Sequence, residues 1–256
     1  MTAPPSVAHA RASAAAAAVP DLLEVNRRFY DGLWRDARLV DPARFNTWPL
    51  VAALTAQAGN RLELAPGLRP RLPVAGSVFV DISAPALRQL HAHGGHASQA
   101  LADALPFADA SFDLVCAFDI VEHIADDTAA IAELARVCKP DATLLLSVPL
   151  HMTAWTPFDA FVGHYRRYEP AALQALLAEH GFAVERSAVH GMQPTSTWLL
   201  RLGMWFLVHR RERAMWWYNR VIMRFALGAQ PPLDVRPGMI STTGVDTVLL
   251  VCRKRR

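Results

Sequence analysis

The sequence has few cysteines and very few lysines, and both scarcities narrow the possible function classes. The three cysteines of the 256 residues, Cys116, Cys138 and Cys252, are widely spaced and lie in apolar surroundings. This spacing excludes a disulfide framework and a zinc-finger site, and it indicates a reducing, cytoplasmic compartment. Nearly all basic residues are arginines, and they concentrate after residue 200. The net charge of +3, without a recognised binding module, gives no support for a nucleic-acid partner.

The sequence also lacks a long hydrophobic run. No apolar stretch reaches the roughly 18 residues that a membrane-spanning helix needs. The alanine run Ala14–Ala18 is weakly apolar and is preceded by a single basic residue, Arg11, so we predict a disordered tail over residues 1–20 rather than a cleaved leader. With 52% hydrophobic and 19% charged residues, the chain can bury one large core.

From residue 59 onward, short apolar runs alternate with helical segments. The predicted strands are Leu62–Ala65, Val78–Val80, Asp113–Asp119, Thr143–Val148, Phe182–Val189 and Thr247–Cys252. The predicted helices are one beginning at Asp21, Trp48–Ala56, Pro85–His91, Asp127–Val137 and one opened by Pro170. This alternation predicts an α/β fold with a doubly wound, mostly parallel sheet and helices on both faces. We expect residues 21–58 to form helices covering the site and residues 59–256 to form the domain, with a helical insertion at 191–245.

Several acidic residues follow strands, where ligands bind in such sheets. The chain reads RLELAPG at 61–67, FVDIS at 79–83, DALPF at 103–107 and DIVEHI at 119–124, followed by CKPDATLLLSVP at 138–149 and GHYRRY at 163–168. An acidic side chain after a strand can accept two hydroxyls, but aspartate also commonly caps turns.

This ordered set of motifs, over about residues 60 to 190 and the final strand, resembles the class I S-adenosylmethionine-dependent methyltransferases that modify small molecules. The resemblance implies a Rossmann-like, seven-stranded sheet and S-adenosyl-L-methionine as cofactor. By motif position, Asp81 would hold the ribose, and Ile82, Asp103 and Ala104 would hold the adenine. The implied contacts of the methionine end are Glu63, Ala65 and Gly67, and Asp119 would lie beside that end or beside the reacting methyl group.

The loop after the first strand departs from the family pattern. Its three usual glycine positions read Ala65, Gly67 and Arg69, and two prolines follow. We therefore expect the helix that normally follows this loop to be reduced to a turn. Either Arg69 or Arg71 could pair with the cofactor carboxylate, or both could face solvent.

His123 allows three interpretations. It could position or pack locally, or it could act as the general base that takes the acceptor proton. The spacing Asp119-x-x-Glu122-His123 also resembles a metal cluster of certain O-methyltransferases and RNA 2′-O-methyltransferases, although we assign no metal.

The GHYRRY motif would face the acceptor pocket, which suits an anionic or phenolic acceptor, or it would form a surface loop anchored by its tyrosines. Together with His123, His164 of this motif is a candidate catalytic residue.

The insertion interleaves tryptophans with arginines. Residues 196–227 could form a lid over an apolar acceptor, contact a membrane surface at the inner face, or simply pack against the domain. The predicted function is methylation, by O-methyl transfer, of a small-molecule acceptor. The alternative is a catalytically impaired cofactor-binding protein with a regulatory role. A nicotinamide-dependent oxidoreductase is a weaker alternative, because the sequence lacks the GxGxxG loop that binds such a cofactor.

Overall fold

The computed structural model describes residues 22–35, 37–191 and 197–255, so the predicted tail and the cap at Asp21 lie outside the described residues. The helices are α1 (Leu22–Arg35), α2 (Trp48–Thr55), α3 (Ala84–Ala92), α4 (Asp127–Val137), α5 (Pro157–Val162), α6 (Pro170–Glu179), α7 (Thr197–His209), α8 (Arg211–Trp217) and α9 (Met223–Gly228). The strands are β1 (Arg61–Leu64), β2 (Val78–Asp81), β3 (His96–Gln99), β4 (Phe112–Phe118), β5 (Cys138–Pro149), β6 (Phe182–His190), β7 (Arg236–Pro237) and β8 (Thr247–Lys254).

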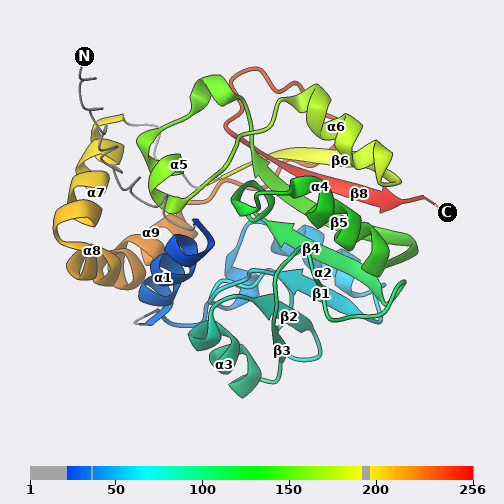
Figure 1. Ribbon diagram of the computed structural model, residues 1–256, viewed down its shortest axis with the longest axis horizontal. Coiled ribbons are helices and arrows are strands. Elements are labelled where there is room, and N and C mark those ends of the chain that lie inside the picture. The colour runs from blue at the N-terminus through cyan, green and yellow to red at the C-terminus, as the bar shows by residue number, and fades with distance from the viewer. Residues whose placement is uncertain (1–21, 36, 192–196, 256) are drawn as a thin grey trace, which may run out of the picture.

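The strands form one sheet in the order β3-β2-β1-β4-β5-β8-β6-β7 (Figure 1). β1, β2, β3, β4 and β5 pair in parallel, whereas β8 runs antiparallel to both β5 and β6. The predicted mostly parallel, Rossmann-like sheet is confirmed. Its strand count is eight rather than seven, because the two-residue strand β7 extends the edge at β6.

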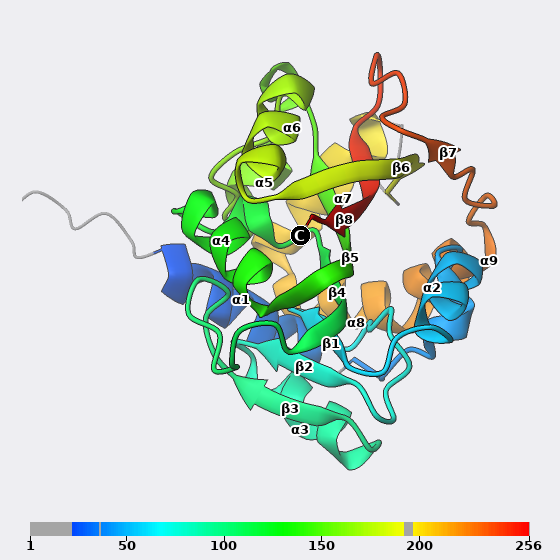
Figure 2. The same ribbon diagram turned by 90° about the vertical axis from the view of Figure 1, so that its right-hand side faces the viewer.

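Each face of the sheet carries its own hydrophobic core (Figure 2). On one face, α4 and α6 contribute Ile131, Leu134 and Leu173 to a core with β4, β5 and β8. On the other face, α2 and α3 contribute Val51 and Leu90. The central strands are apolar on both faces because both faces are covered, which is why they appear as continuous hydrophobic runs in the sequence.

The connection between β1 and β2 contains no helix, as the two prolines predict. Residues 65–77, all described, form turns. Leu72, in this connection, and helix α2 pack into the core on this face. Thus α2 covers a face of the sheet, and it is α1 that lies over the strand ends.

Helix α1 crosses the carboxyl edge of the sheet and touches the segments that follow three strands. Ser83, after β2, donates to Asp31 (2.7 Å). Tyr30 contacts His123, after β4, and the Asn26 amide reaches the carbonyl of Gly163 at 3.5 Å. The insertion helices secure α1 from outside, since Met215 of α8 is buried against its apolar residues.

Candidate active site

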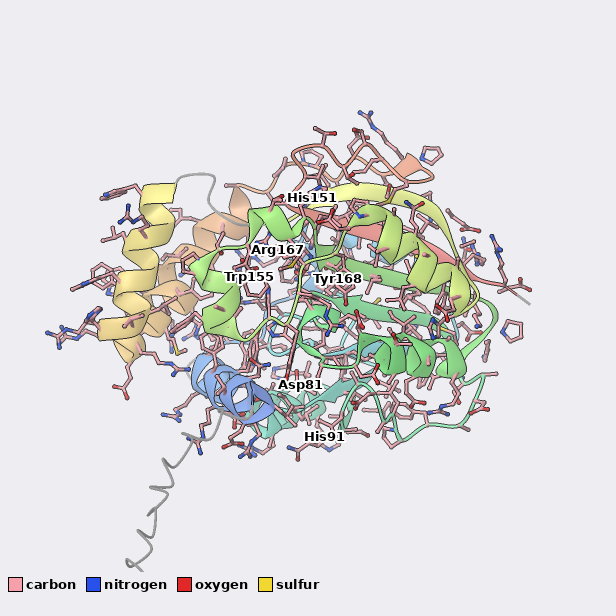
Figure 3. All side chains as sticks on the ribbon, turned by 45° about the horizontal axis from the view of Figure 1, so that its top comes forward. Asp81, His91, His151, Trp155, Arg167 and Tyr168 are labelled. Carbon is pink, nitrogen blue, oxygen red and sulfur yellow. The ribbon has the colours of Figure 1, made fainter. Side chains whose placement is uncertain are left out.

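The candidate site lies where β1, β2 and β4 end, below α1, and Figure 3 places Asp81 next to that helix. The backbone is unusual here: Ala65 after β1 and Asp119 after β4 both have a φ of +50°. Non-glycine residues avoid this region, and such outliers concentrate at functional sites. Ala65 occupies the first of the three glycine positions expected from the resemblance, and it adopts the left-handed backbone conformation that glycine favours.

Asp81 is buried and joins the first two strand ends. One carboxylate oxygen accepts from the backbone N–H of Gly67 (2.9 Å) and the other from that of Ser83 (2.8 Å). Burial raises the pKa of Asp81 to about 6, although these N–H groups work in the opposite direction. Each oxygen keeps a further lone pair, so the carboxylate can still accept the two hydroxyls of a ribose.

The indole of Trp34 lies directly against Gly67. A Cβ atom at Gly67 would lie 2.1 Å from a ring carbon of Trp34, and the φ of Gly67 is +53°. Both observations require glycine at this position. In this conformation α1 therefore covers the glycine turn that the resemblance assigns to the methionine end of the cofactor.

Glu63 is buried within β1, and its carboxylate accepts the backbone N–H groups of Arg71 and Leu72, at 2.9 Å from the nearest oxygen in each case. Burial raises the pKa of Glu63 to about 7. The Glu63 side chain thus holds the proline-containing connection between β1 and β2 against β1. Its predicted contact with the cofactor ammonium remains a prediction.

Neither arginine of the loop simply faces solvent. Arg69 donates to the Tyr218 hydroxyl (3.2 Å) and to Asn219 (3.0 Å) and lies over the Trp34 ring. It therefore ties the insertion to the loop. The Arg71 guanidinium lies 3.6 Å from the ring centroid of Phe45, and burial lowers its pKa to about 10, so it stays charged at neutral pH.

A cavity of about 250 Å³ opens between α1 and the end of β2. It is lined by Leu23, Glu24, Arg27, Ile82, Gln99, Ala100 and Leu101. Ile82 thus lines this cavity together with residues 99–101, which lead to Asp103. The predicted contact of Ile82 with the adenine remains a prediction. Asp103 and Ala104 are both exposed beyond the cavity.

Asp119 is exposed at the end of β4, and Ser147 of β5 holds it in place. The Ser147 hydroxyl donates to the Asp119 carboxylate (2.8 Å), and its oxygen accepts the Asp119 backbone N–H (3.0 Å). The carboxylate is therefore fixed at the strand end, with its second oxygen available.

His123 contacts two side chains from distant parts of the sequence. Its Nε2 lies 3.2 Å from the Tyr30 hydroxyl, and its ring meets that of His164 edge-on, with 4.4 Å between centroids. Burial, followed by the neighbouring His164, lowers the pKa of His123 to about 3. A neutral imidazole with so low a pKa is a weak base in this conformation.

His164 is oriented by a buried carboxylate. Its Nδ1 lies 2.9 Å from Asp159, which also pairs with Arg167 at 3.0 Å. Burial favours the neutral form, but the hydrogen bonds from His164, Arg167 and Thr156 hold the pKa of Asp159 well below its usual range. With Nδ1 bonded to Asp159, Nε2 of His164 points toward Glu122, 3.9 Å away.

The carboxylate of Glu122 lies next to these two histidines. It is buried and accepts no hydrogen bond from the described residues. Burial and the charge of Asp119 raise its pKa well above the usual range, which favours a neutral acid. Glu122, His123 and His164 bring ligand atoms within 4.8 Å of one another, so they are the described residues that could hold a metal ion.

The remaining residues of the GHYRRY motif are largely occupied within the protein. Arg166 pairs with Asp127, Arg167 pairs with Asp159 and Asp246, and the Tyr168 hydroxyl donates to Asp127 (2.9 Å). Arg167 and Tyr168, which Figure 3 labels near the centre of the view, are both buried. This network fits the interpretation of an anchored loop and leaves His164 as the motif's contribution to the site.

Three participants had no signal in the sequence. Tyr30 and Trp34 look like two further apolar positions of an amphipathic helix, and Asp159 looks like a helix-capping residue. Only the packing of α1 on the strand ends brings Tyr30 to His123 and Trp34 to Gly67, whereas the turn after α5 brings His164 to Asp159.

Residues 64–146 match the family model of the methyltransferase domain. A probable S-adenosylmethionine-dependent methyltransferase of Mycolicibacterium smegmatis is 38% identical over 85 residues, which are 32% of this chain and 32% of that protein. The probable methyltransferase Rv3030 of Mycobacterium tuberculosis is 35% identical over 82 residues, 30% of this chain and 29% of the relative. The chain therefore spans about a third of the length of these relatives.

Solved structures share the fold over most of the chain. A possible histamine N-methyltransferase from Thermotoga maritima superposes with a TM-score of 0.59 at 14% identity, covering 91% of this chain and all of that one. The [4+2]-cyclase SpnF superposes with a TM-score of 0.58 at 17% identity, covering 90% of this chain and 94% of that one. A fold does not by itself fix a reaction. The domain match, the relatives and the fold nonetheless agree: residues 64–146 are similar to the methyltransferase domains of S-adenosylmethionine-dependent methyltransferases, which implies S-adenosyl-L-methionine as the cofactor.

Proposed function

We propose that this protein transfers the methyl group of S-adenosylmethionine to a hydroxyl of a small-molecule acceptor. The observation that carries the proposal is the Asp81 carboxylate, which is buried at the end of β2, bonded to the Gly67 N–H and situated between the glycine turn and Ile82 of the cavity. This combination provides acceptors for ribose hydroxyls next to an apolar slot.

The residues present fit an adenosine group better than the methionine end. Asp81 and Ile82 would hold the ribose and the adenine, and a cavity of about 250 Å³ is somewhat below the roughly 300–1,000 Å³ of drug-sized ligand pockets. Trp34 covers Gly67, so α1 must shift before Gly67 and Asp119 can contact the methionine end of the cofactor. When bound, the cofactor supplies an electrophilic methyl group on a sulfonium.

The chain's own contribution to the chemistry is positioning, exclusion of water and removal of a proton. Helix α1 closes the strand ends, which fixes the geometry of the reacting groups and keeps water away. His164 is the base in this proposal, because Asp159 holds its Nδ1 and leaves the lone pair on Nε2, which lies 3.9 Å from Glu122 in this conformation. His123 is neutral and, with Tyr30, bounds the space beside it.

Calorimetry with S-adenosylmethionine and with its demethylated product tests the proposal. We expect saturable binding of both and transfer of a labelled methyl group to hydroxyl-bearing acceptors. Absence of heat with either ligand at millimolar concentration would refute cofactor binding. Binding without transfer to any of a panel of hydroxyl, amine and carbon acceptors would refute the enzymatic role.

We also propose a cytoplasmic location, and the cysteines support it. All three are free and buried, as expected for a protein that folds in a reducing compartment.

A further inference from the structure

The insertion carries a concentration of exposed large hydrophobic side chains. Nine of the fourteen exposed large hydrophobics of the described chain lie between residues 198 and 225. They are Trp198, Leu202, Trp205, Phe206, Val208, Trp216, Trp217, Ile222 and Phe225, which we call the α7–α9 face. Isolated exposed hydrophobics are ordinary, but a cluster of this kind marks a surface that contacts something else.

The exposed hydrophobic side chains of helix α7 are regularly spaced rather than scattered. Trp198, Leu202 and Trp205 recur at i, i+4 and i+7, so they form one stripe along the helix. In a surface helix such a stripe normally faces the core, yet here Trp198 is 65% and Trp205 50% exposed. Helix α7 lies at the margin of the molecule, outside α9 and away from the sheet (Figure 1).

The insertion is attached to the domain through different residues. Met215 of α8 is buried against α1, and Met223 and Leu227 of α9 are buried with Phe45. Because these inward residues anchor the helices, the exposed ones are available to a partner.

The charge of the same segment is strongly one-sided. Within residues 197–228 the only acidic residue is Glu212, whereas the exposed arginines are Arg201, Arg210, Arg211, Arg213, Arg220 and Arg224. Arg211 lies over the ring of Phe29. The other five have no ion pair among the described residues. Arginines without an ion pair, next to exposed aromatic side chains, complement a partner surface that has an anionic outer layer over an apolar interior.

The dimensions of the segment suit contact along such a surface. A helix of 13 residues is about 20 Å long, and no helix in the described part of the chain is long and apolar enough to cross a membrane. Tryptophan favours the boundary between lipid headgroups and acyl chains, and arginine favours the phosphates above it.

We propose that the α7–α9 face docks on an anionic lipid bilayer, with its aromatic side chains at the headgroup boundary and its arginines against lipid phosphates. This inference does not depend on the methyl transfer proposed above, because it uses none of the site residues.

Vesicle flotation of the full chain tests the proposal. The vesicles contain either phosphatidylcholine alone or phosphatidylcholine with one third phosphatidylglycerol. We expect binding to the anionic vesicles at 0.1 M NaCl, a several-fold loss at 0.5 M NaCl because salt screens the arginines, and little binding to phosphatidylcholine alone. Trp198→Ala/Trp205→Ala should lower the partition coefficient at least tenfold, whereas the exposed Val189→Ala should not change it.

A second pair of variants tests the charges without touching the apolar side chains. Arg213→Gln/Arg220→Gln should weaken binding to anionic vesicles at least fivefold and flatten its salt dependence. The matched control Arg88→Gln/Arg236→Gln removes two exposed arginines elsewhere and should have little effect. If near-ultraviolet circular dichroism shows that the tryptophan variant is misfolded, the arginine variant and its control test the proposal on their own.

Three results would overturn the proposal. The first is equal binding to both vesicle types, and the second is equal loss in variants and controls. The third is absence of vesicle binding together with dimers that the tryptophan variant dissociates in sedimentation velocity, which would assign the face to a second copy of the chain.

Discussion

Replacing Asp81 by asparagine should separate cofactor affinity from stability. The carboxylate accepts one backbone N–H on each oxygen, from Gly67 and from Ser83. An amide keeps the size of the side chain but converts one acceptor into a donor that faces an N–H. It therefore loses one backbone hydrogen bond and can no longer accept both ribose hydroxyls.

The stability terms of this substitution oppose each other. Burial raises the pKa of Asp81 from 3.8 to about 6, so ionisation at pH 7 costs the folded state about 3 kcal/mol. Asparagine removes this cost, and it loses a hydrogen bond to a charged group worth about 1.5–3 kcal/mol. We expect the free energy of unfolding to change by no more than about 1.5 kcal/mol, which is the difference between these terms. Cofactor affinity should fall by about 1.5–3 kcal/mol, or roughly 10- to 150-fold.

Urea denaturation and calorimetric titration with S-adenosylmethionine measure the two quantities on the same preparation. Asp113→Asn is the matched control. Asp113 also accepts a backbone N–H, from Asn60 (2.8 Å), but it lies at the opposite end of β4, so its substitution should leave the affinity unchanged. An unchanged affinity in Asp81→Asn would show that this carboxylate does not hold the ribose.

Further predictions address the base, the loop and the buried glutamate. His164→Ala should lower kcat by about 10²–10⁴-fold with little change in cofactor affinity, and a chelator should leave the wild-type rate unchanged; a loss that a divalent cation restores would instead assign Glu122, His123 and His164 to a metal. Gly67→Ala should lower the free energy of unfolding by at least about 1–2 kcal/mol, because alanine resists a positive φ and its methyl group meets Trp34; adding Trp34→Ala should recover part of the loss in a double-mutant cycle, and strictly additive effects would refute the contact. Burial raises the pKa of Glu63 to about 7, above its unfolded value, so the stability that its neutral form provides at low pH is lost as the pH rises through 7. The free energy of unfolding of Glu63→Gln, measured by urea denaturation, should therefore rise by about 2–3 kcal/mol relative to that of wild type between pH 5 and pH 8. If the difference between variant and wild type stays constant across that range, the assignment is contradicted.

Sequence patterns predicted the elements that are buried on both faces. β4 and β5 appear as continuous apolar runs because helices cover them on each side. The strand β3 was missed because His96–Gln99 is polar and lies at the sheet edge, where no hydrophobic pattern is required. The fold class followed from the alternation of strands and helices, since short connections leave few alternative topologies.

The carboxylates at strand ends were also predictable. The carboxyl ends of parallel strands lie at one edge of the sheet, and each motif places its aspartate at the end of its own strand. Asp81 and Asp119 depend only on that local register. The covering of the site was not predictable. Tyr30 lies against His123 and Trp34 against Gly67, although 93 residues separate the first pair. Such contacts arise from the packing of whole helices, in which many similar apolar positions compete. The outward orientation of the α7 stripe has the same origin: periodicity shows that a helix has an apolar face, and only the tertiary structure decides whether that face is buried.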